Sequence, residues 1–367
     1  MMDIGGYVET EFEPVLDAFA ANFDERGELA AQVCVYVAGR PVVDLWGGCA
    51  PDSLMLVFSA TKGVTAVCAN LLIERGALDP DAPVQRYWPE FRDKRVTVRH
   101  VLSHQAGLPL VEGPITLDEA LRWEPVVQRL ARQQPLWEPG TKHGYHMRTF
   151  GWLVGELIRR VDGRTVGRFF RDEIAYRLSL DFWIGLPDEH ESRVVPLVPP
   201  DADMRAALEP LKDRLLLARV FANPGDHFNY DTMWNRRELH ACELPSSNGI
   251  GDARSLARLY AAVGGEVDGV RVLQADSVEA ARAIQAKGPD AVILVESAFG
   301  LGFMLGAAFG AANPPSVFGH AGAGGSLAFA DPERGVAFAY VMNHLRFDPA
   351  GDPRSETLVR ALYRSLG

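Results

Sequence analysis

The sequence is poor in the features that mark membrane, metal-binding and nucleic-acid-binding proteins. It has only four cysteines in 367 residues, and their spacing matches no metal-binding motif. It contains no apolar run of about 18 residues, so no membrane span is expected. The formal charge of −11 is spread along the chain without long blocks of one sign, which makes nucleic acids and anionic membranes poor partners.

Signals for export and for cofactor binding are also missing. The N-terminal stretch MMDIGGYVETEFEPVLDAF has neither the basic nor the apolar segment of a secretory signal. The glycine-rich stretches GLGFMLG and GAGGS precede strand patterns rather than a helix, so no dinucleotide cofactor is expected. Cys34 and Cys68 lie in apolar runs and are expected to be buried free thiols. We therefore expect a soluble, cytoplasmic globular protein without a cofactor.

Strand patterns lie at both ends of the chain, and helical patterns lie in the middle. Two β-rich runs surround Ala38-Gly39-Arg40, and two more surround residues 331–335, so a hairpin is expected at each place. Helical periodicity dominates residues 116–180 and returns in a final helix, DPRSETLVRALYRSL. The simplest arrangement is an α+β fold in which an antiparallel sheet built from both termini is flanked by helices.

The helical middle predicts a domain inserted into this sheet. We expect a sheet domain formed by residues 1–85 and 186–367, and a mostly helical domain at residues 86–185. Residues 186–248 have several prolines and few periodic runs, so they are predicted to be irregular.

The stretch VFSATKG places a serine and a lysine three residues apart at the start of a predicted helix. Ser59 and Lys62 would share one face of that helix. A serine hydroxyl needs a base to become a nucleophile, and a lysine is such a base only when its pKa is depressed. The same spacing arises by chance about once in a chain of this length, and an isolated pair of this kind is more often a surface or capping pair than a catalytic one. No G-x-S-x-G elbow is present, which argues against an α/β-hydrolase triad.

Two further stretches fit an active site or a plain structural role. In WEPGTKHGYHMRTF, Tyr145 precedes a predicted helix, where it would reach into a cleft and move protons, or simply pack in the core. In VFGHAGAGGSLAFAD, a strand carries His320-Ala321-Gly322 and is followed by more glycines. Glycines there would let a substrate lie close to the strand backbone, or would form an ordinary hairpin.

Taken in order, SATKG, GTKHGYH and GHAG resemble the three motifs of the serine β-lactamase and penicillin-binding-protein superfamily. The flanking stretches VRHVLSHQAGLP and LPSSNGIGDARSLARLYAA resemble the class C β-lactamase-like carboxylesterases, which are called family VIII esterases. This resemblance runs from about residue 30 to residue 345. It implies a β-lactamase-like fold with the active site in the cleft between the two domains.

The resemblance also implies a role for each motif residue. Ser59 would be the acylated nucleophile, and Lys62 would accept its proton. Tyr145 would share this proton transfer, with its pKa lowered by Lys62. The backbone N–H groups of Ser59 and Ala323 would form the oxyanion hole. Acylation would release an alcohol, and water would then release the acid.

Two departures from the antibiotic-cleaving enzymes favour an uncharged ester as substrate. Their Tyr-x-Asn motif is replaced by Tyr145-His146-Met147, and their Lys-Thr-Gly motif by His320-Ala321-Gly322. Four residues are expected to contact the substrate: Met147, His320, Ala321 and Gly322. A neutral histidine holds a carboxylate less firmly than a lysine does.

We therefore expect a serine carboxylesterase for short-chain esters. The alternatives are a β-lactamase or D-amino-acid peptidase, an acyltransferase, and a binding protein without activity. That binding protein would be expected to lack Ser59, Lys62 or Tyr145, and all three are present.

Other residues of catalytic type are better explained by packing. His100 and His104 have a spacing that can bind metal, but no third ligand is evident, so helix capping and packing are expected and no metal site is predicted. Four tryptophans would line an apolar acyl pocket or, as is more usual for this residue, the core: Trp46, Trp137, Trp183 and Trp234.

Overall fold

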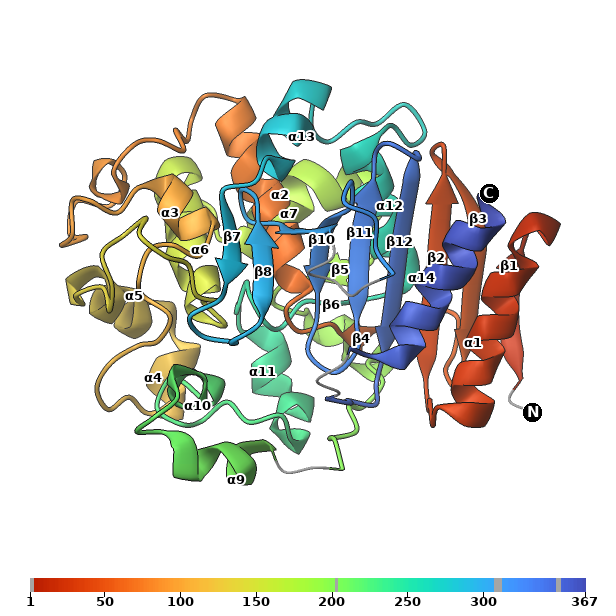
Figure 1. Cartoon of the computed structure of the whole chain (residues 1–367), viewed down its shortest axis with the longest axis horizontal. Coiled ribbons are helices and arrows are strands. Elements are labelled where there is room, and N and C mark those ends of the chain that lie inside the picture. Colours follow the sequence, from red (N-terminus) through yellow and green to blue (C-terminus); the bar gives the residue numbers. More distant parts are fainter. Residues whose placement is uncertain (1–2, 202–203, 307–311, 348–350) are drawn as a thin grey trace.

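The computed structural model describes residues 3–201, 204–306, 312–347 and 351–367 (Figure 1). Its main feature is a nine-stranded antiparallel sheet with the order β1-β3-β2-β12-β11-β10-β9-β8-β7. The strands are β1 Ile4–Val8, β2 Ala31–Val37, β3 Arg40–Gly47, β7 Ala286–Pro289, β8 Glu296–Phe299, β9 Met304–Leu305, β10 Phe318–Ala321, β11 Leu327–Asp331 and β12 Val336–Met342.

The two ends of the chain meet in the middle of this sheet. Strands β2 and β12 pair antiparallel, with Val37 opposite Val336 and Ala31 opposite Met342. Both strands are almost wholly buried, which explains why their sequences, AQVCVYV and VAFAYVM, are continuous apolar runs instead of alternating ones. The predicted α+β fold with an antiparallel sheet from both termini is confirmed, and both predicted hairpins are present.

Helices cover both faces of the sheet. Helices α1 (Glu13–Glu25) and α14 (Pro353–Ser365) pack together across β1, β3 and β2, and α12 (Ala253–Gly264) lies against β2, β11 and β12 (Figure 1). Helix α2 (Thr61–Glu74) is buried continuously from Thr61 to Leu72. Because a helix that is apolar on all sides must be surrounded by protein, α2 forms the centre of the molecule, between β10, α6 and α7.

Shorter helices gather at the end of the molecule opposite α1 and α14 (Figure 1). The remaining helices are α3 Val98–Leu102, α4 Leu117–Leu121, α5 Trp123–Arg132, α6 Thr149–Asp162, α7 Val166–Phe170, α8 Tyr176–Leu178, α9 Met204–Leu208, α10 Leu216–Phe221, α11 Arg237–Ala241 and α13 Ala275–Arg282. Helices α9, α10 and α11, with short 3-10 turns, occupy the stretch that was predicted to be irregular. The division into two domains stays a prediction.

A second, three-stranded sheet joins parts of the chain that were assigned to different domains. Its order is β4 (Met55–Leu56), β6 (Ile250–Gly251) and β5 (Phe182–Trp183). Strand β4 leads directly into the turn that holds Ser59.

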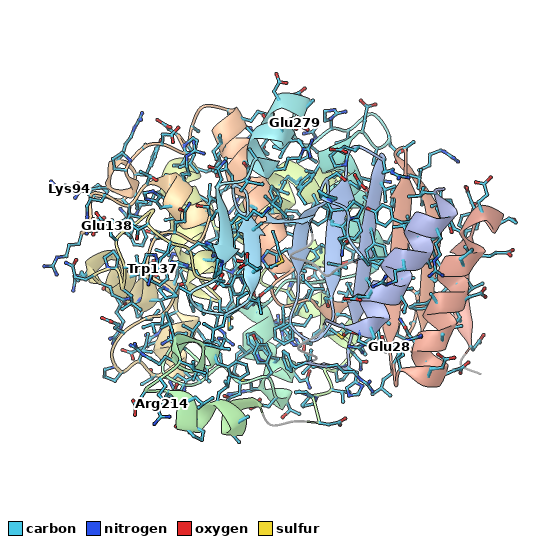
Figure 2. The ribbon with its side chains drawn as sticks, viewed as in Figure 1. Glu28, Lys94, Trp137, Glu138, Arg214 and Glu279 are labelled. Carbon is cyan, nitrogen blue, oxygen red and sulfur yellow. The ribbon has the colours of Figure 1, made fainter. Side chains whose placement is uncertain are left out.

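Burial follows the expected pattern. Cys34 and Cys68 are buried free thiols, as predicted. The labelled charged side chains Lys94, Glu138, Arg214 and Glu279 are exposed, whereas Glu28 is buried near α14 (Figure 2). No helix within the described ranges is long and apolar enough to cross a lipid bilayer.

Candidate active site

Ser59 lies in a tight turn at the N-terminus of α2. The preceding residue, Phe58, has a φ of +45°, which is a strained conformation for an aromatic residue. Its carbonyl oxygen accepts hydrogen bonds from the N–H and from the hydroxyl of Thr61, at 2.9 and 2.5 Å. This turn leaves Ser59 partly exposed between the buried Phe58 and Ala60. Helix α2 begins at Thr61, so Ser59 lies just before the helix and Lys62 lies in its first turn.

Lys62 is fully buried one turn further along α2. Its Nζ lies 2.9 Å from Ser59 Oγ, 2.6 Å from the carbonyl oxygen of Met147 and 2.9 Å from that of Ser246. Burial lowers the pKa of Lys62 well below its usual value, and the positive charge of Arg148 lowers it further. A neutral amine has two N–H donors and one lone pair. The two carbonyl oxygens can only accept hydrogen bonds, so they take the two N–H groups. The lone pair then faces the Ser59 hydroxyl, which is the one partner that can donate a proton.

Tyr145 lies close to both Ser59 and Lys62 and is almost fully buried. Its ring is 4.8 Å from Lys62 Nζ and stacks on Phe299 with a centroid distance of 6.2 Å. Burial raises the pKa of Tyr145 far above its usual value, although a hydrogen bond with Ser59 lowers it in part. The expectation that Lys62 gives this tyrosine a low pKa is wrong, because desolvation of the phenolate outweighs nearby charge. Tyr145 is therefore a neutral phenol that can donate a proton.

Asp290, which the sequence analysis did not single out, holds the Tyr145 segment in place. One carboxylate oxygen accepts the N–H of Tyr145 at 3.0 Å and also the N–H groups of Val292 and Ile293, at 2.8 and 3.0 Å. The other oxygen accepts the Ser297 hydroxyl at 3.2 Å. An aspartate after Gly-Pro is typical of turns, which was the only signal for it in the sequence.

His320 on β10 faces this group from the sheet. Its ring centroid is 5.9 Å from that of Tyr145, and burial lowers its pKa to about 3. Because Nδ1 lies 2.6 Å from the carbonyl oxygen of Ala321, Nδ1 carries the proton and Nε2 is an acceptor. That Nε2 has no hydrogen-bond partner within the described part of the chain. His320 thus presents a neutral, unpaired acceptor.

The turn after β10 lies against the segment that carries Ser59. A Cβ placed on Gly322 would lie 2.2 Å from the carbonyl oxygen of Val57, so only glycine fits. Among the residues that the structure describes, the N–H groups of Ser59 and Ala323 donate to no acceptor. Two free backbone donors beside a serine hydroxyl are what an oxyanion hole requires.

Met147 contacts Lys62 through its main chain. Its sulfur lies 3.7 Å from the Tyr230 hydroxyl and 3.6 Å from Arg148. Arg148 is buried, and it donates to the carbonyl oxygens of Phe221 and Phe228 at 2.7 and 3.0 Å. Neither the role of Arg148 nor that of Ser246 was apparent in the sequence, because both depend on contacts with distant segments.

Three other histidines, His100, His104 and His146, serve packing and capping. His146 donates from Nδ1 to the carbonyl oxygen of Gly144 at 2.7 Å, and burial lowers its pKa to about 4. His104 accepts the N–H of His146 at 3.1 Å, and His100 accepts the N–H of Thr97 at 3.3 Å, which caps α3. No group of three possible metal ligands occurs within the described ranges.

Two of the four tryptophans border this site. Trp137 belongs to an apolar cluster with Tyr145 and Met147, and Trp234 packs edge-on against Phe58 at 5.1 Å. The other two lie elsewhere: Trp46 sits on β3 against Gly5, and Trp183 on β5 stacks on His190.

Comparison with known proteins identifies the family of this chain. A protein-family model described as Beta-lactamase matches residues 16–362. The chain belongs to the β-lactamase family. The esterase/beta-lactamase LipL of Mycobacterium tuberculosis is 38% identical over 362 residues, which cover 93% of this chain and 83% of that protein.

Solved structures of esterases are also similar to this chain. The structure of EstA from Arthrobacter nitroguajacolicus Rue61a has a TM-score of 0.90 at 34% identity, and covers 99% of this chain and 98% of that one. A family VIII carboxylesterase has a TM-score of 0.89 at 33% identity, and covers 99% of this chain and all of the other. The chain is a serine hydrolase of the β-lactamase fold and resembles its esterase branch.

Proposed function

We propose that this protein is a serine carboxylesterase that hydrolyses short-chain, uncharged esters through an acyl-enzyme on Ser59. The observation that carries the proposal is the environment of Lys62. A fully buried amine with a depressed pKa lies 2.9 Å from the Ser59 hydroxyl, and its other two partners are carbonyl oxygens that cannot give it a proton. Such an amine is a general base for one particular hydroxyl group.

Acylation begins when Ser59 Oγ attacks the ester carbonyl carbon and its proton passes to Lys62 Nζ. The carbonyl oxygen becomes an oxyanion, which accepts hydrogen bonds from the N–H groups of Ser59 and Ala323. When the tetrahedral intermediate collapses, the bond to the alcohol oxygen breaks. The neutral phenol of Tyr145 donates its proton to that oxygen. The Lys62 ammonium, which lies 4.8 Å from the Tyr145 ring, then passes the proton it took from Ser59 to the Tyr145 phenolate, so that both groups are neutral again.

Deacylation repeats these steps with water as the nucleophile. Water gives a proton to the amine–phenol pair as it attacks the acyl carbon, and the pair returns one to Ser59 Oγ as the acid leaves. The charges of Lys62 and Tyr145 are therefore the same at the beginning and at the end of each cycle.

The neutrality of the site supports an uncharged substrate. His320 has a pKa near 3 and is neutral at physiological pH, and the guanidinium of Arg148 is turned to backbone carbonyls. A substrate carboxylate left unpaired in such a site would cost about 1–3 kcal/mol or more. Trp137, Tyr145 and Met147 belong to an apolar cluster, which suits alkyl or aryl groups.

Two measurements test the proposal. A fluorophosphonate should label the wild type on Ser59, and Ser59→Ala should abolish hydrolysis of p-nitrophenyl butyrate while the protein stays folded. Ser277→Ala, a serine on α13 outside the site, is the matched control and should keep full activity. Label on another serine would refute the mechanism. A kcat/KM for nitrocefin equal to that for p-nitrophenyl butyrate would refute the substrate class.

A further inference from the structure

The turn that carries Ala323 is held by few contacts of its own. The Gly322 N–H donates to the carbonyl oxygen of Ser326 at 2.6 Å, and the Gly325 N–H donates to that of Gly322 at 3.3 Å. Gly324 and Gly325 have φ values of +84° and +128°. A turn so rich in glycine has many accessible backbone conformations, so something outside it must select this one.

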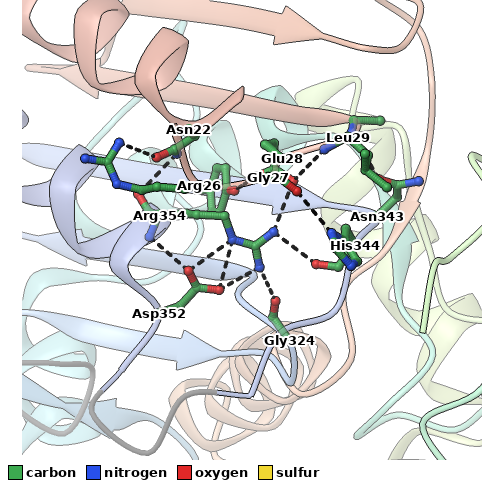
Figure 3. A network of polar contacts seen from close by, with 12 residues as sticks. Asn22, Arg26, Gly27, Glu28, Leu29, Gly324, Asn343, His344, Asp352 and Arg354 are labelled. Atoms are coloured by element: carbon green, nitrogen blue, oxygen red, sulfur yellow. Dashed lines mark hydrogen bonds and ion pairs between the residues drawn. The ribbon is translucent and has the colours of Figure 1, made fainter. Parts of the chain in front are cut away.

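One outside contact is the buried guanidinium of Arg354 at the start of α14 (Figure 3). A second is the backbone N–H of Arg346, which donates to the Gly324 carbonyl oxygen at 3.2 Å. In the guanidinium of Arg354, Nη2 donates at 2.7 Å to the carbonyl oxygen of Gly324, the residue that follows Ala323. Nη1 donates to Glu28 at 3.1 Å and to the carbonyl oxygen of His344 at 3.0 Å. Nη2 and Nε also bind the carboxylate of Asp352, at 2.7 and 3.1 Å.

This network is buried and densely hydrogen-bonded. The side chains of Arg354 and Glu28 are fully buried, and Glu28 also accepts the Tyr340 hydroxyl. The turn rests directly on the network, because a Cβ on Gly325 would lie 2.3 Å from an Asp352 oxygen and 2.8 Å from Arg354 Nη2. All five N–H groups of the guanidinium have acceptors, and only arginine offers five donors in one plane.

We propose that Arg354 is a positioning residue for the oxyanion hole: by binding the Gly324 carbonyl it fixes the turn in the conformation that points the Ala323 N–H at the reacting carbonyl. The inference rests on the proposed function. Small displacements of a catalytic group are costly, and loss of one oxyanion donor lowers kcat by about 10²–10³-fold. The last helix of the chain thus acts on the first chemical step without touching substrate.

Arg354→Lys tests this inference, because lysine keeps the positive charge. Its single ammonium nitrogen cannot contact all four partners of the guanidinium at once: Glu28, Gly324, His344 and Asp352. The fraction of competent enzyme is counted by complete fluorophosphonate labelling, and kcat is expressed per labelled site. We expect kcat to fall about tenfold to hundredfold, which is less than the fall expected when one oxyanion-hole donor is removed completely. The KM should stay within about twofold of the wild-type value. The dissociation constant of phenylboronic acid, whose serine adduct is tetrahedral, should rise by the same factor as kcat falls.

Glu156→Gln is the matched control. Glu156 is as buried as Glu28 and binds Arg159 and Arg160 on α6, so its loss also breaks a buried ion pair. We expect its kcat per labelled site to stay within about twofold of wild type.

Unchanged kcat and boronate affinity in Arg354→Lys would overturn the inference. If Arg354→Lys does not fold, Asp352→Asn is tested in its place. We expect its kcat to fall about threefold to tenfold, which on a logarithmic scale is half the effect expected for Arg354→Lys. An unchanged kcat in Asp352→Asn would overturn the inference. Wild-type protein without esterase activity or label would instead refute the proposed function.

Discussion

Replacing Lys62 with arginine separates its proton chemistry from its charge. Arginine keeps a cation in the same place but cannot give up its proton near neutral pH. The general base would be lost, which lowers the rate by about 10²–10⁴-fold, or raises the barrier by roughly 3–5 kcal/mol. Because Lys62 is fully buried and has three partners within 2.9 Å, water has no room to replace it as the base. We expect Lys62→Arg to be nearly as inactive as Lys62→Ala.

The assay is kcat/KM for p-nitrophenyl butyrate across pH, with circular dichroism to confirm folding. In the wild type, kcat/KM should rise with pH through the pKa of Lys62, since only the neutral amine accepts the serine proton. The midpoint of this limb of the pH profile should lie well below 10.5, the usual pKa of lysine, because burial and Arg148 depress the pKa of Lys62. Lys62→Arg should lose the limb, whereas Lys94→Arg, an exposed lysine, should keep it. A folded Lys62→Arg enzyme with more than a tenth of wild-type kcat/KM would show that Lys62 acts only as a charge.

Two further predictions follow from the site geometry. Tyr145→Phe should lower kcat by about 10²–10⁴-fold with little change in KM, while Tyr176→Phe, 84% exposed, should change neither; a Tyr145→Phe enzyme within threefold of wild type would make Tyr145 a packing residue. Gly322→Ala should lower stability by about 1–3 kcal/mol and kcat by more than about tenfold, because its Cβ would lie 2.2 Å from the Val57 oxygen. At Gly265 an added Cβ would lie 3.3 Å from the Ala261 oxygen, which requires a much smaller shift, so Gly265→Ala should lose less stability than Gly322→Ala and should keep the wild-type kcat.

Much of the fold could be predicted because it depends on local patterns. The hairpin at Ala38–Arg40 and the final helix beginning at Pro353 were expected from adjacent residues and are present, and the Thr97 cap of α3 is equally local. Their causes act over a few residues: turn geometry, a side chain that accepts a backbone N–H, and a proline at the first helical position. The short helices within residues 186–248 were not predicted, because their apolar residues are too few to show a period.

The candidate site divides in the same way. The sequence alone placed Ser59 and Lys62 on one face of a helix, since residues three apart are always neighbours there. It also established that Tyr145 and His320 belong to ordered motifs. The protonation states came only from the tertiary structure: Tyr145 was expected to have a lowered pKa, and burial raises it instead. Desolvation depends on every residue packed around a group, and a local pattern does not contain them.

Long-range partners were equally invisible in the sequence. Lys62 is held by the carbonyl oxygens of Met147 and Ser246, and Tyr145 by Asp290, each far away along the chain. The pairing of Arg354 with Glu28 joins residues 326 positions apart. Spacing and residue type determined which groups this protein has for catalysis. Folding decided which of them meet, how dry their surroundings are and which proton each one holds, because contact and solvation are properties of the packed chain.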